Sequence, residues 1–303
     1  MAGPKQGDFT VRPPAVAGRF YPAEARACRA LATSYLEHAP GVEGPGKQWI
    51  GGIVPHAGWI CSGAIAGRTI AALAASGTDR KIDVVVVFGA VHSATPLDYA
   101  ALDSHTRWDV PGGESELPEE LERKLTETSA HYFQVDDRFH RREHAVEVEL
   151  PLIQVAWPGV SVLPIEVPAI SQAVEIGEKA AKTLQSAGLS AVFLASSDLT
   201  HYGPGYEFTP AGVGLAALQW ARENDRRLLD RVTRLSAEEV VNETRSRLNA
   251  CGGGAIAAML AASRVFGAKQ AEVLQHTNSY EVLREISDHG PENAVGYAAV
   301  VVG

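Results

Sequence analysis

The sequence predicts an α/β protein with a mainly parallel or mixed central sheet that is flanked by helices. Strand-like and helix-like segments alternate over most of the chain, which favours parallel strands joined by helical crossovers. Residues 82–88 also lack polar alternation, as expected of a strand that is buried on both faces. The 303 residues contain no internal repeat, low-complexity tract or long linker. We therefore expect a flexible N-terminal arm over residues 1–11 and a single domain over residues 12–303.

The expected strands are short apolar runs bounded by turn-forming residues, at 49–54, 82–88, 100–102, 160–167, 191–195, 271–276 and 296–301. The expected helices show apolar residues at helical spacing, at 23–39, 62–76, 117–128, 144–156, 172–187, 210–232, 237–247 and 254–265. A Gly/Pro-rich loop over residues 40–47 precedes the first long strand. Ser62 is a plausible cap for the second helix, and Pro151 would kink or end the fourth.

Composition excludes several classes of function. The 27 Lys and Arg residues against 36 Asp and Glu residues give a net charge of −9, and no basic cluster suggests a nucleic-acid or membrane partner. The N-terminal sequence MAGPKQGDFTVRPP lacks the apolar stretch of a signal peptide, and no apolar run approaches the roughly 20 residues of a membrane span. Three scattered cysteines do not make a disulfide framework, and we expect Cys28 and Cys61 to be small buried side chains. These features predict a soluble, cytoplasmic protein.

Three apolar runs each end in a short loop that carries a histidine. IGGIV leads to His56, VVVVFGA leads to His92, and AVFLA leads to SSDLTH, which ends at His201. In a parallel sheet such loops gather outside the carboxyl ends of the strands, where open sheets bind ligands. A single histidine in a turn or surface loop is usually without function. Three in equivalent loops favour a metal site or an acid–base site.

Asp198 lies three residues before His201, a spacing at which the carboxylate could share a metal with the imidazole or orient it. Alternatively, Ser197 and Asp198 would suit the cap of a helix. Cys251 precedes three glycines and an Ala-rich helix, and the helix start would favour its thiolate. A thiolate is a soft ligand for iron, zinc or copper, or a nucleophile beside a histidine base. The remaining interpretation of Cys251 is a small buried side chain.

The segment EHAVEVE is another candidate. On a helix, His144 and Glu147 would share one face and form an acid–base pair, whereas the alternative is a solvated charged face.

The segments PHAGWICSG, EHAVEVELPLIQ, SSDLTHYG and ACGGGAI, in this order, resemble the Memo family, which includes the mediator of cell motility and the microbial AmmeMemoRadiSam system protein B. The resemblance runs from about residue 11 to the C-terminus and includes RPPAVAGRFYP, the WDVPG turn and the terminal GYAAVVV. It implies a fold like that of class III extradiol dioxygenases, which are non-haem Fe(II) enzymes.

The resemblance also implies a metal pocket formed by His56, His92 and Cys251, with Fe(II) expected first and copper or zinc as alternatives. His144, His201 and Asp198 would line the same pocket as catalytic residues. Many family members have Gly-Pro-Asn-His where this chain has Gly89-Ala90-Val91-His92, and Cys61 replaces a usual aromatic residue. Neither departure removes a ligand. The cysteine in place of the dioxygenase carboxylate makes the site softer, so catechol cleavage is not carried over from the fold.

Three hypotheses follow. The first is a metal-dependent redox enzyme of unknown substrate, in which His144 or His201 transfers protons. The second is a non-catalytic module that binds a peptide or protein through a vestigial pocket, because the eukaryotic relatives are described as binding phosphorylated peptides. The family name adds AMMECR1-type and radical-SAM proteins as expected partners. The third is a thiol hydrolase with Cys251 as its nucleophile.

Overall fold

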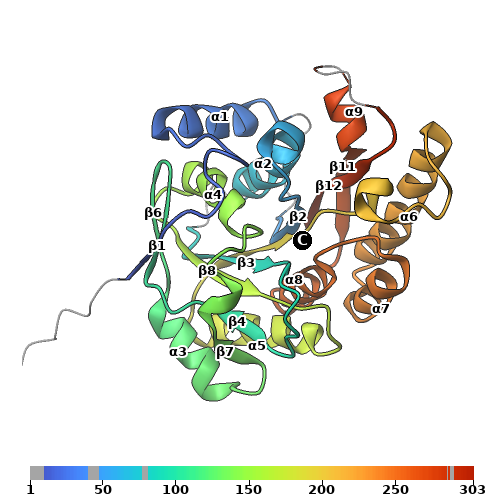
Figure 1. The fold of residues 1–303 in the computed structure, drawn as a ribbon. Helices are drawn as coiled ribbons and strands as arrows, with labels where there is room; N and C mark the ends of the chain where they lie inside the picture. The colour runs from blue at the N-terminus through green and yellow to red at the C-terminus, as the bar shows by residue number, and fades with distance from the viewer. Residues whose placement is uncertain (1–9, 40–47, 77–80, 285, 287–289) are drawn as a thin grey trace, which may run out of the picture.

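The computed structural model describes residues 10–39, 48–76, 81–284, 286 and 290–303 (Figure 1). Residues 1–9 of the expected arm and the Gly/Pro-rich loop over residues 40–47 lie outside the described residues. The last residue of the expected arm, Val11, lies in a short strand.

A mixed sheet runs through the middle of the molecule. Its strands are β2 (Gly51–Val54), β3 (Val84–Gly89), β4 (Ala100–Leu102), β7 (Phe133–Val135), β8 (Ser161–Glu166), β9 (Ala191–Ser196), β10 (His201–Tyr202), β11 (Ala271–Asn278) and β12 (Ala294–Val302). Their order is β10-β12-β2-β9-β3-β8-β4-β7, and β11 pairs with β12. The four central strands, β2, β9, β3 and β8, are parallel to one another. The strands on either side of them are antiparallel: β12 to β2, and β4 to β8. The predicted α/β class is confirmed.

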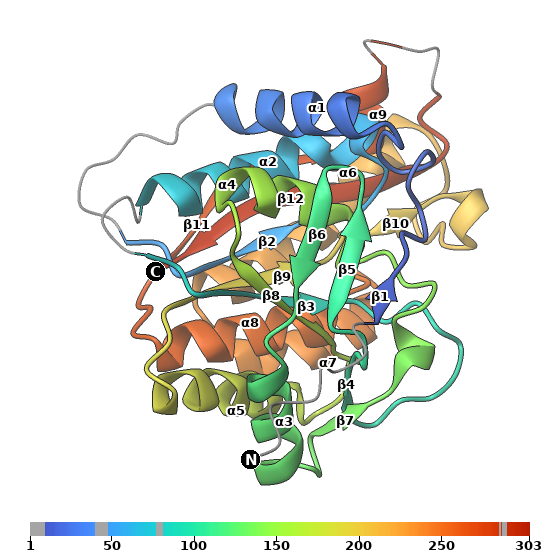
Figure 2. The same cartoon turned by 90° about the vertical axis from the view of Figure 1, so that its left-hand side faces the viewer.

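Helices cover both faces of this sheet, as Figure 2 shows. One face carries α1 (Ala25–Glu37), α2 (Trp59–Ser76) and α4 (Leu150–Ala156), and the other carries α5 (Ala173–Ser186), α7 (Ala237–Arg247) and α8 (Gly253–Val265). The remaining helices lie at the margins: α3 (Glu119–Thr128), α6 (Leu215–Thr233) and α9 (Ser279–Leu283). Two apolar cores result, because the strands present valine, isoleucine and leucine to both faces.

Helix α2 is long and apolar enough to cross a membrane by length and composition. More than half of it is buried inside the fold, where it packs against β2, β12 and α1. Its apolar composition is therefore that of a core helix.

A second, three-stranded sheet joins β1 (Val11–Arg12), β5 (Arg107–Val110) and β6 (Gly113–Glu116). The WDVPG segment, expected as a turn, thus supplies most of β5 and then the start of the hairpin. Gly112 and Gly113 turn this hairpin with φ of +129° and +145°, values that favour glycine.

The structure corrects the expected helix over residues 144–156. It contains only a 3₁₀ turn, η2 (Glu147–Glu149), followed by α4. Pro151 neither kinks nor ends a helix, because it stands in the first turn of α4, where its missing N–H is tolerated. Ser62 does not cap α2, which already begins at Trp59. Two further 3₁₀ turns are η1 (Asp137–Phe139) and η3 (Pro204–Tyr206).

Candidate metal centre

The three histidine-bearing loops leave adjacent parallel strands. The strand order β2-β9-β3 places the carboxyl ends of these strands side by side (Figures 1 and 2). His56 lies two residues after β2, His92 lies three residues after β3, and Asp198 lies two residues after β9. The short loops leave little freedom to move apart, so the sheet itself brings these side chains to one edge.

Three imidazoles meet there. Each of His56, His92 and His144 offers a ring nitrogen, and the three nitrogens all lie within 4.8 Å of one another. The His92 and His144 rings stack with centroids 4.8 Å apart, and the His56 ring stands edge-on to both. Cys251 Sγ lies 3.3 Å from His56 Nε2. The three imidazoles therefore converge on one point, and the Cys251 thiol lies beside one of them, His56.

The hydrogen bonds select which nitrogen each imidazole presents. Ser196 Oγ donates to the Ala145 carbonyl at 2.6 Å, so at 2.8 Å it accepts the Nδ1 proton of His56. The Glu143 carboxylate accepts the Nδ1 proton of His92 at 2.8 Å. In their neutral forms both rings therefore turn an unprotonated Nε2 toward the centre. This second layer of contacts is typical of histidines that bind metals.

Two carboxylates, those of Asp198 and Glu143, also fix the backbone of the loops that carry the histidines. Asp198 Oδ1 accepts the backbone N–H of His56 at 2.9 Å. Glu143 accepts the backbone N–H groups of His92 and His144 at 2.9 and 2.8 Å. Because each carboxylate bridges two segments, the positions of the imidazoles depend on backbone contacts as well as on side-chain packing.

Cys251 is held by close packing of the glycines that follow it. Gly252, which precedes α8, donates its N–H to Ser197 Oγ at 2.9 Å and so ties the start of α8 to the loop after β9. A Cβ at Gly252 would lie 2.7 Å from Ser197 Cβ, and one at Gly253 would collide with Thr244 Oγ1. The Gly-Gly-Gly run therefore allows α8 to start directly behind the β9 loop and places the thiol beside His56.

The donors influence one another's ionisation. Burial opposes charge on His56, but Cys251 and Asp198 outweigh it and raise the pKa of His56 to about 9. The same holds for His92, whose pKa is raised against burial to about 11 by Cys251 and Glu143. For Cys251, burial opposes ionisation, yet the two imidazoles lower the pKa of the thiol to about 6. The side chains alone therefore form a thiolate–imidazolium cluster at neutral pH.

The pKa values of His144 and His201 are shifted in opposite directions. Burial and the positive charge of His56 lower the pKa of His144 to about 4, so its imidazole is neutral at pH 7. Burial also disfavours charge on His201, but the Asp198 carboxylate, with Oδ2 3.8 Å from its Nε2, contributes to a raised pKa. The site thus pairs a proton acceptor with a proton donor.

A cavity of about 410 Å³ opens beside these groups. His144, His201 and Asp198 line it together with His56 and His92. Its other walls are largely apolar or aromatic and include Phe20, Cys61, Tyr206, Val295 and Tyr297. Cys61, expected to be a buried side chain, is half-buried in this wall, whereas Cys28 is fully buried in the core.

The expected pair of His144 and Glu147 does not form. Glu147 is fully buried and faces away, because it forms an ion pair with Arg12 at 2.8 Å and accepts hydrogen bonds from Tyr21 and two backbone N–H groups. His144 lies before the 3₁₀ turn η2 and is part of no helix, so the helical i, i+3 argument does not apply to it. The partner near His144 is instead Glu143, whose Oε1 lies 3.4 Å from His144 Nδ1.

The sequence argument missed three residues of the site. Glu143 and Ser196 orient the two imidazoles, and the Phe20 ring lies 4.7 Å from that of His144. Glu143 stands next to His144, and Ser196 is the first polar residue after AVFLA, so proximity in the sequence was the available signal. Phe20 carried no signal of its own.

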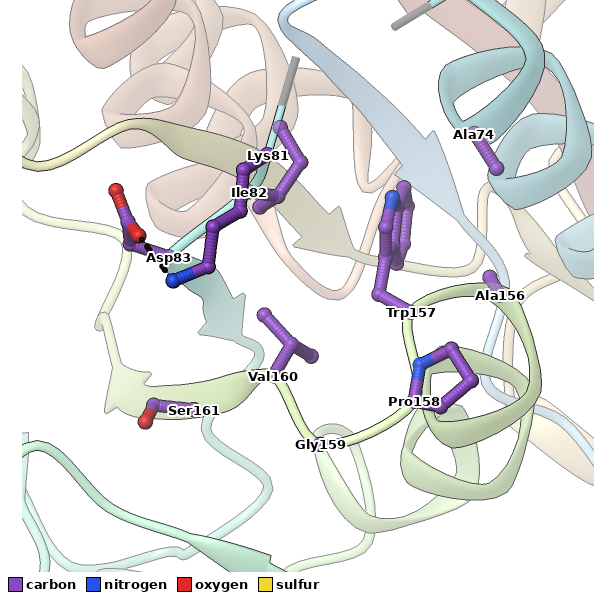
Figure 3. Close-up of a pocket in the computed structure, with 10 residues that line it drawn as sticks. All are labelled: Ala74, Lys81, Ile82, Asp83, Ala156, Trp157, Pro158, Gly159, Val160 and Ser161. Atoms are coloured by element: carbon purple, nitrogen blue, oxygen red, sulfur yellow. Dashed lines mark ion pairs between the residues drawn. The ribbon is translucent and has the colours of Figure 1, made fainter. Parts of the chain in front are cut away.

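A second hollow, of about 510 Å³, lies at the opposite ends of β3 and β8 (Figure 3). Figure 3 shows Trp157 and Pro158 on one side and the ion pair between Lys81 and Asp83 on the other. Its described lining contains neither histidine nor cysteine. The chemistry of the protein therefore concentrates in the smaller cavity.

Comparison with known proteins decides the family. The model of the Memo-like protein family matches residues 12–301. The chain belongs to the Memo family. Similar relatives are MEMO1 family proteins of Methanococcoides burtonii, 33% identical over 296 residues, and of Pyrococcus horikoshii, 31% identical over 301 residues. The alignments cover 96% of this chain and 100% and 99% of these relatives.

The departures of this Memo-family chain leave the centre intact. Ala90 is buried and Val91 packs into a small cluster, yet the loop still delivers His92 to Glu143. The loss of a polar loop residue therefore removes no donor.

Proposed function

We propose that this Memo-family protein is a metal-dependent oxidoreductase that binds Fe(II), or alternatively copper or zinc, through His56, His92 and Cys251. The observation that carries the proposal is the orientation of both imidazoles by Ser196 and Glu143, which directs Nε2 toward the thiol. Two ligands at about 2.1 and 2.3 Å from a tetrahedral ion lie about 3.5 Å apart, close to the 3.3 Å between His56 Nε2 and Cys251 Sγ. The donor set therefore fits a metal.

When bound, the metal would supply Lewis-acid chemistry and, if it is iron or copper, one-electron chemistry at positions that the protein leaves open. The protein side chains would do the rest. The neutral imidazole of His144 would accept a proton from a molecule in the cavity, and His201, whose pKa Asp198 helps to raise, would donate one. The apolar and aromatic walls would hold a small substrate and exclude water. A reducing compartment such as the cytoplasm suits a reactive thiolate of this kind.

Metal content tests the proposal directly. The wild type, His56→Ala and Cys251→Ala are purified anaerobically, offered Fe(II), Cu(I) or Zn(II), and analysed by mass spectrometry. Each variant should retain one equivalent of metal less than the wild type. His131→Ala, at an exposed histidine, is the matched control and should retain as much as the wild type. Equal metal content in all four proteins would refute the proposal.

A partner-binding role is the second candidate. Ile60, beside the cavity wall, and Tyr206, in it, are 68% and 44% exposed, which suits a surface that docks a peptide. The expected partners are AMMECR1-type and radical-SAM proteins or a phosphorylated peptide. Saturable binding of one of them that is unchanged in His56→Ala would favour this role over catalysis.

A further inference from the structure

Polar side chains gather at a second place where parallel strands end. Strands β4 and β7 pair in parallel, with Leu102 opposite Val135. Asp103 follows β4 directly, His105 comes two residues later, and Asp137 begins η1 two residues after β7. This place lies beside α3, at the opposite end of the sheet order from β12 and away from α2 and α9 (Figures 1 and 2).

The three side chains approach one another closely. One oxygen or nitrogen from each of Asp103, His105 and Asp137 lies within 4.8 Å of the other two. Asp103 is fully buried, and its carboxylate is fixed by Trp108 Nε1 at 2.6 Å and by His105 Nδ1 at 2.8 Å. The backbone N–H of Ser104 holds Asp137 Oδ1 at 3.0 Å. The carboxylates are thus positioned by neutral donors as well as by the imidazole.

A third carboxylate points to a ligand at this place. Glu122 of α3 is only 8% exposed, and its Oε1 is buried without a hydrogen-bond partner in the described part of the chain. Burial raises the pKa of Glu122 to about 8, and Asp103 is the strongest charge that adds to this effect. The hydrogen bond from Leu117 N to Thr106 O, 3.0 Å long, brings the start of α3 beside residues 104–106.

Among the described residues, few protein cations balance the charge of this cluster. The carboxylates of Asp103 and Asp137 meet one imidazole, and the nearby guanidinium of Arg141 lies 4.0 Å from Asp137 Oδ2 on a side chain that is 70% exposed. Buried carboxylates without a cation are costly, and a divalent ion neutralises two of them.

We propose that Asp103, His105 and Asp137 form a second metal site, with Glu122 as an additional ligand or hydrogen-bond acceptor, for a divalent first-row ion such as Zn²⁺ or Mn²⁺. The imidazole favours these ions over Ca²⁺ and Mg²⁺, which prefer oxygen ligands alone. Donors at about 2.0–2.2 Å from a tetrahedral ion lie roughly 3.4 Å apart, so three donors that already lie within 4.8 Å of one another need only small side-chain adjustments to bind it. The site shares no residue with the histidine and cysteine centre and does not depend on the function proposed for it.

Zn²⁺ titration tests the site by calorimetry. The wild type should bind two equivalents, and a His56→Ala/Cys251→Ala variant should bind one. Adding His105→Gln or Asp137→Asn to that variant should weaken the remaining site at least about tenfold. His131→Gln is the matched control and should change nothing, because His131 is exposed and lies outside the cluster.

His105 and Asp137 are partly exposed, so both variants should keep the fold, which circular dichroism checks. In the wild-type background, each should lower the stoichiometry from two to one. Unchanged Zn²⁺ binding in His105→Gln and Asp137→Asn would overturn the second site. Loss of binding only with His56→Ala and Cys251→Ala would overturn it too, while supporting the first centre.

Discussion

At the residue scale, the centre depends on the partners of its histidines as much as on the histidines. Ser196 accepts a hydrogen bond from Nδ1 of His56, and Glu143 accepts one from Nδ1 of His92. Nε2 of each ring is left for a ligand, and that of His56 lies next to Cys251 Sγ. Cys251 entered the predicted ligand set through the resemblance to the Memo family. The strand-to-loop pattern predicted where His56 and His92 lie, because a buried apolar strand ends where its loop begins. It could not predict Glu143 or Ser196 as partners, since those contacts join segments that are about 50 to 140 residues apart in the chain.

Proton release on metal binding follows from these residues. Both imidazoles must lose a proton to bind through Nε2, and the pKa values of His56 and His92 are raised to about 9 and about 11. Below pH 9 both are therefore protonated before metal binds, and metal affinity should rise with pH between 6 and 9. The thiol adds little to this rise above pH 6, because its pKa is already lowered to about 6.

The measurement is Zn²⁺ calorimetry at pH 7 in two buffers of different ionisation enthalpy, with the His105→Gln variant used to remove the second site. Up to two protons should be released per ion. Release that is the same in Glu143→Gln as in the parent variant would contradict the role of Glu143, which raises the pKa of His92.

At the scale of elements, the apolar strands of the main sheet, including the short β2 and β4, and the amphipathic helices were predictable, whereas five other short strands were not. Strands β3 and β9 and helices α5 and α7 follow from apolar periodicity, because each buries most of its own apolar residues. Strands β1, β5, β6, β7 and β10 have two to four residues each. They are stabilised by pairing with distant segments, which leaves no local pattern. The prediction of a helix over residues 144–149 was wrong for the same reason, since the charged residues of this segment form tertiary contacts.

Arg12 is the link between β1 and that segment. Its buried guanidinium pairs with Glu147 at 2.8 Å, donates to the carbonyls of His140 and Glu143 at 2.7 Å, and lies 4.0 Å above the Trp108 ring. Removing one partner of a buried pair leaves an uncompensated charge.

Arg12→Met should therefore lower the free energy of unfolding by about 3–5 kcal/mol, measured by urea denaturation. Arg123→Met is the control: Arg123 pairs on the exposed surface, so its loss should lower the free energy of unfolding far less than the loss of Arg12. The double variant Arg12→Met/Glu147→Met should recover part of the loss. A loss for Arg12→Met no larger than that for Arg123→Met would contradict this account.

At the scale of the whole molecule, two buried carboxyl groups contribute to the response of stability to pH. Glu149 and Glu166 are buried beside the centre, and neither has a hydrogen-bond partner for its oxygens among the described residues. Burial raises the pKa of both well above the ordinary 4.5. Glu166 faces His140, whose own pKa is lowered by burial, at 3.8 Å.

Above pH 4.5 the unfolded chain releases these protons while the folded chain retains them, so stability falls as pH rises. Each group contributes about 1.4 kcal/mol per pH unit until its folded pKa is reached. Glu166→Gln should remove one such contribution, and its gain in stability over the wild type should grow between pH 5 and pH 8. Urea unfolding at both pH values measures it. A difference between the two proteins that does not change with pH would show that Glu166 is ionised in the fold.

The order of strands in the sheet has a consequence for biosynthesis. His56 and His92 leave the ribosome early, whereas Cys251 and the strand that completes the sheet next to β2 come from the last part of the chain. At roughly 5–20 residues per second, the thiol follows the first histidine by on the order of ten seconds or more. Until Cys251 has been synthesised, the nascent chain offers only the imidazoles of this centre to metal ions, so the complete ligand set forms late relative to its histidines. During translation, the two histidines therefore compete for metal ions before the thiolate can take part. Stable metal binding at this centre requires the later segment that carries Cys251.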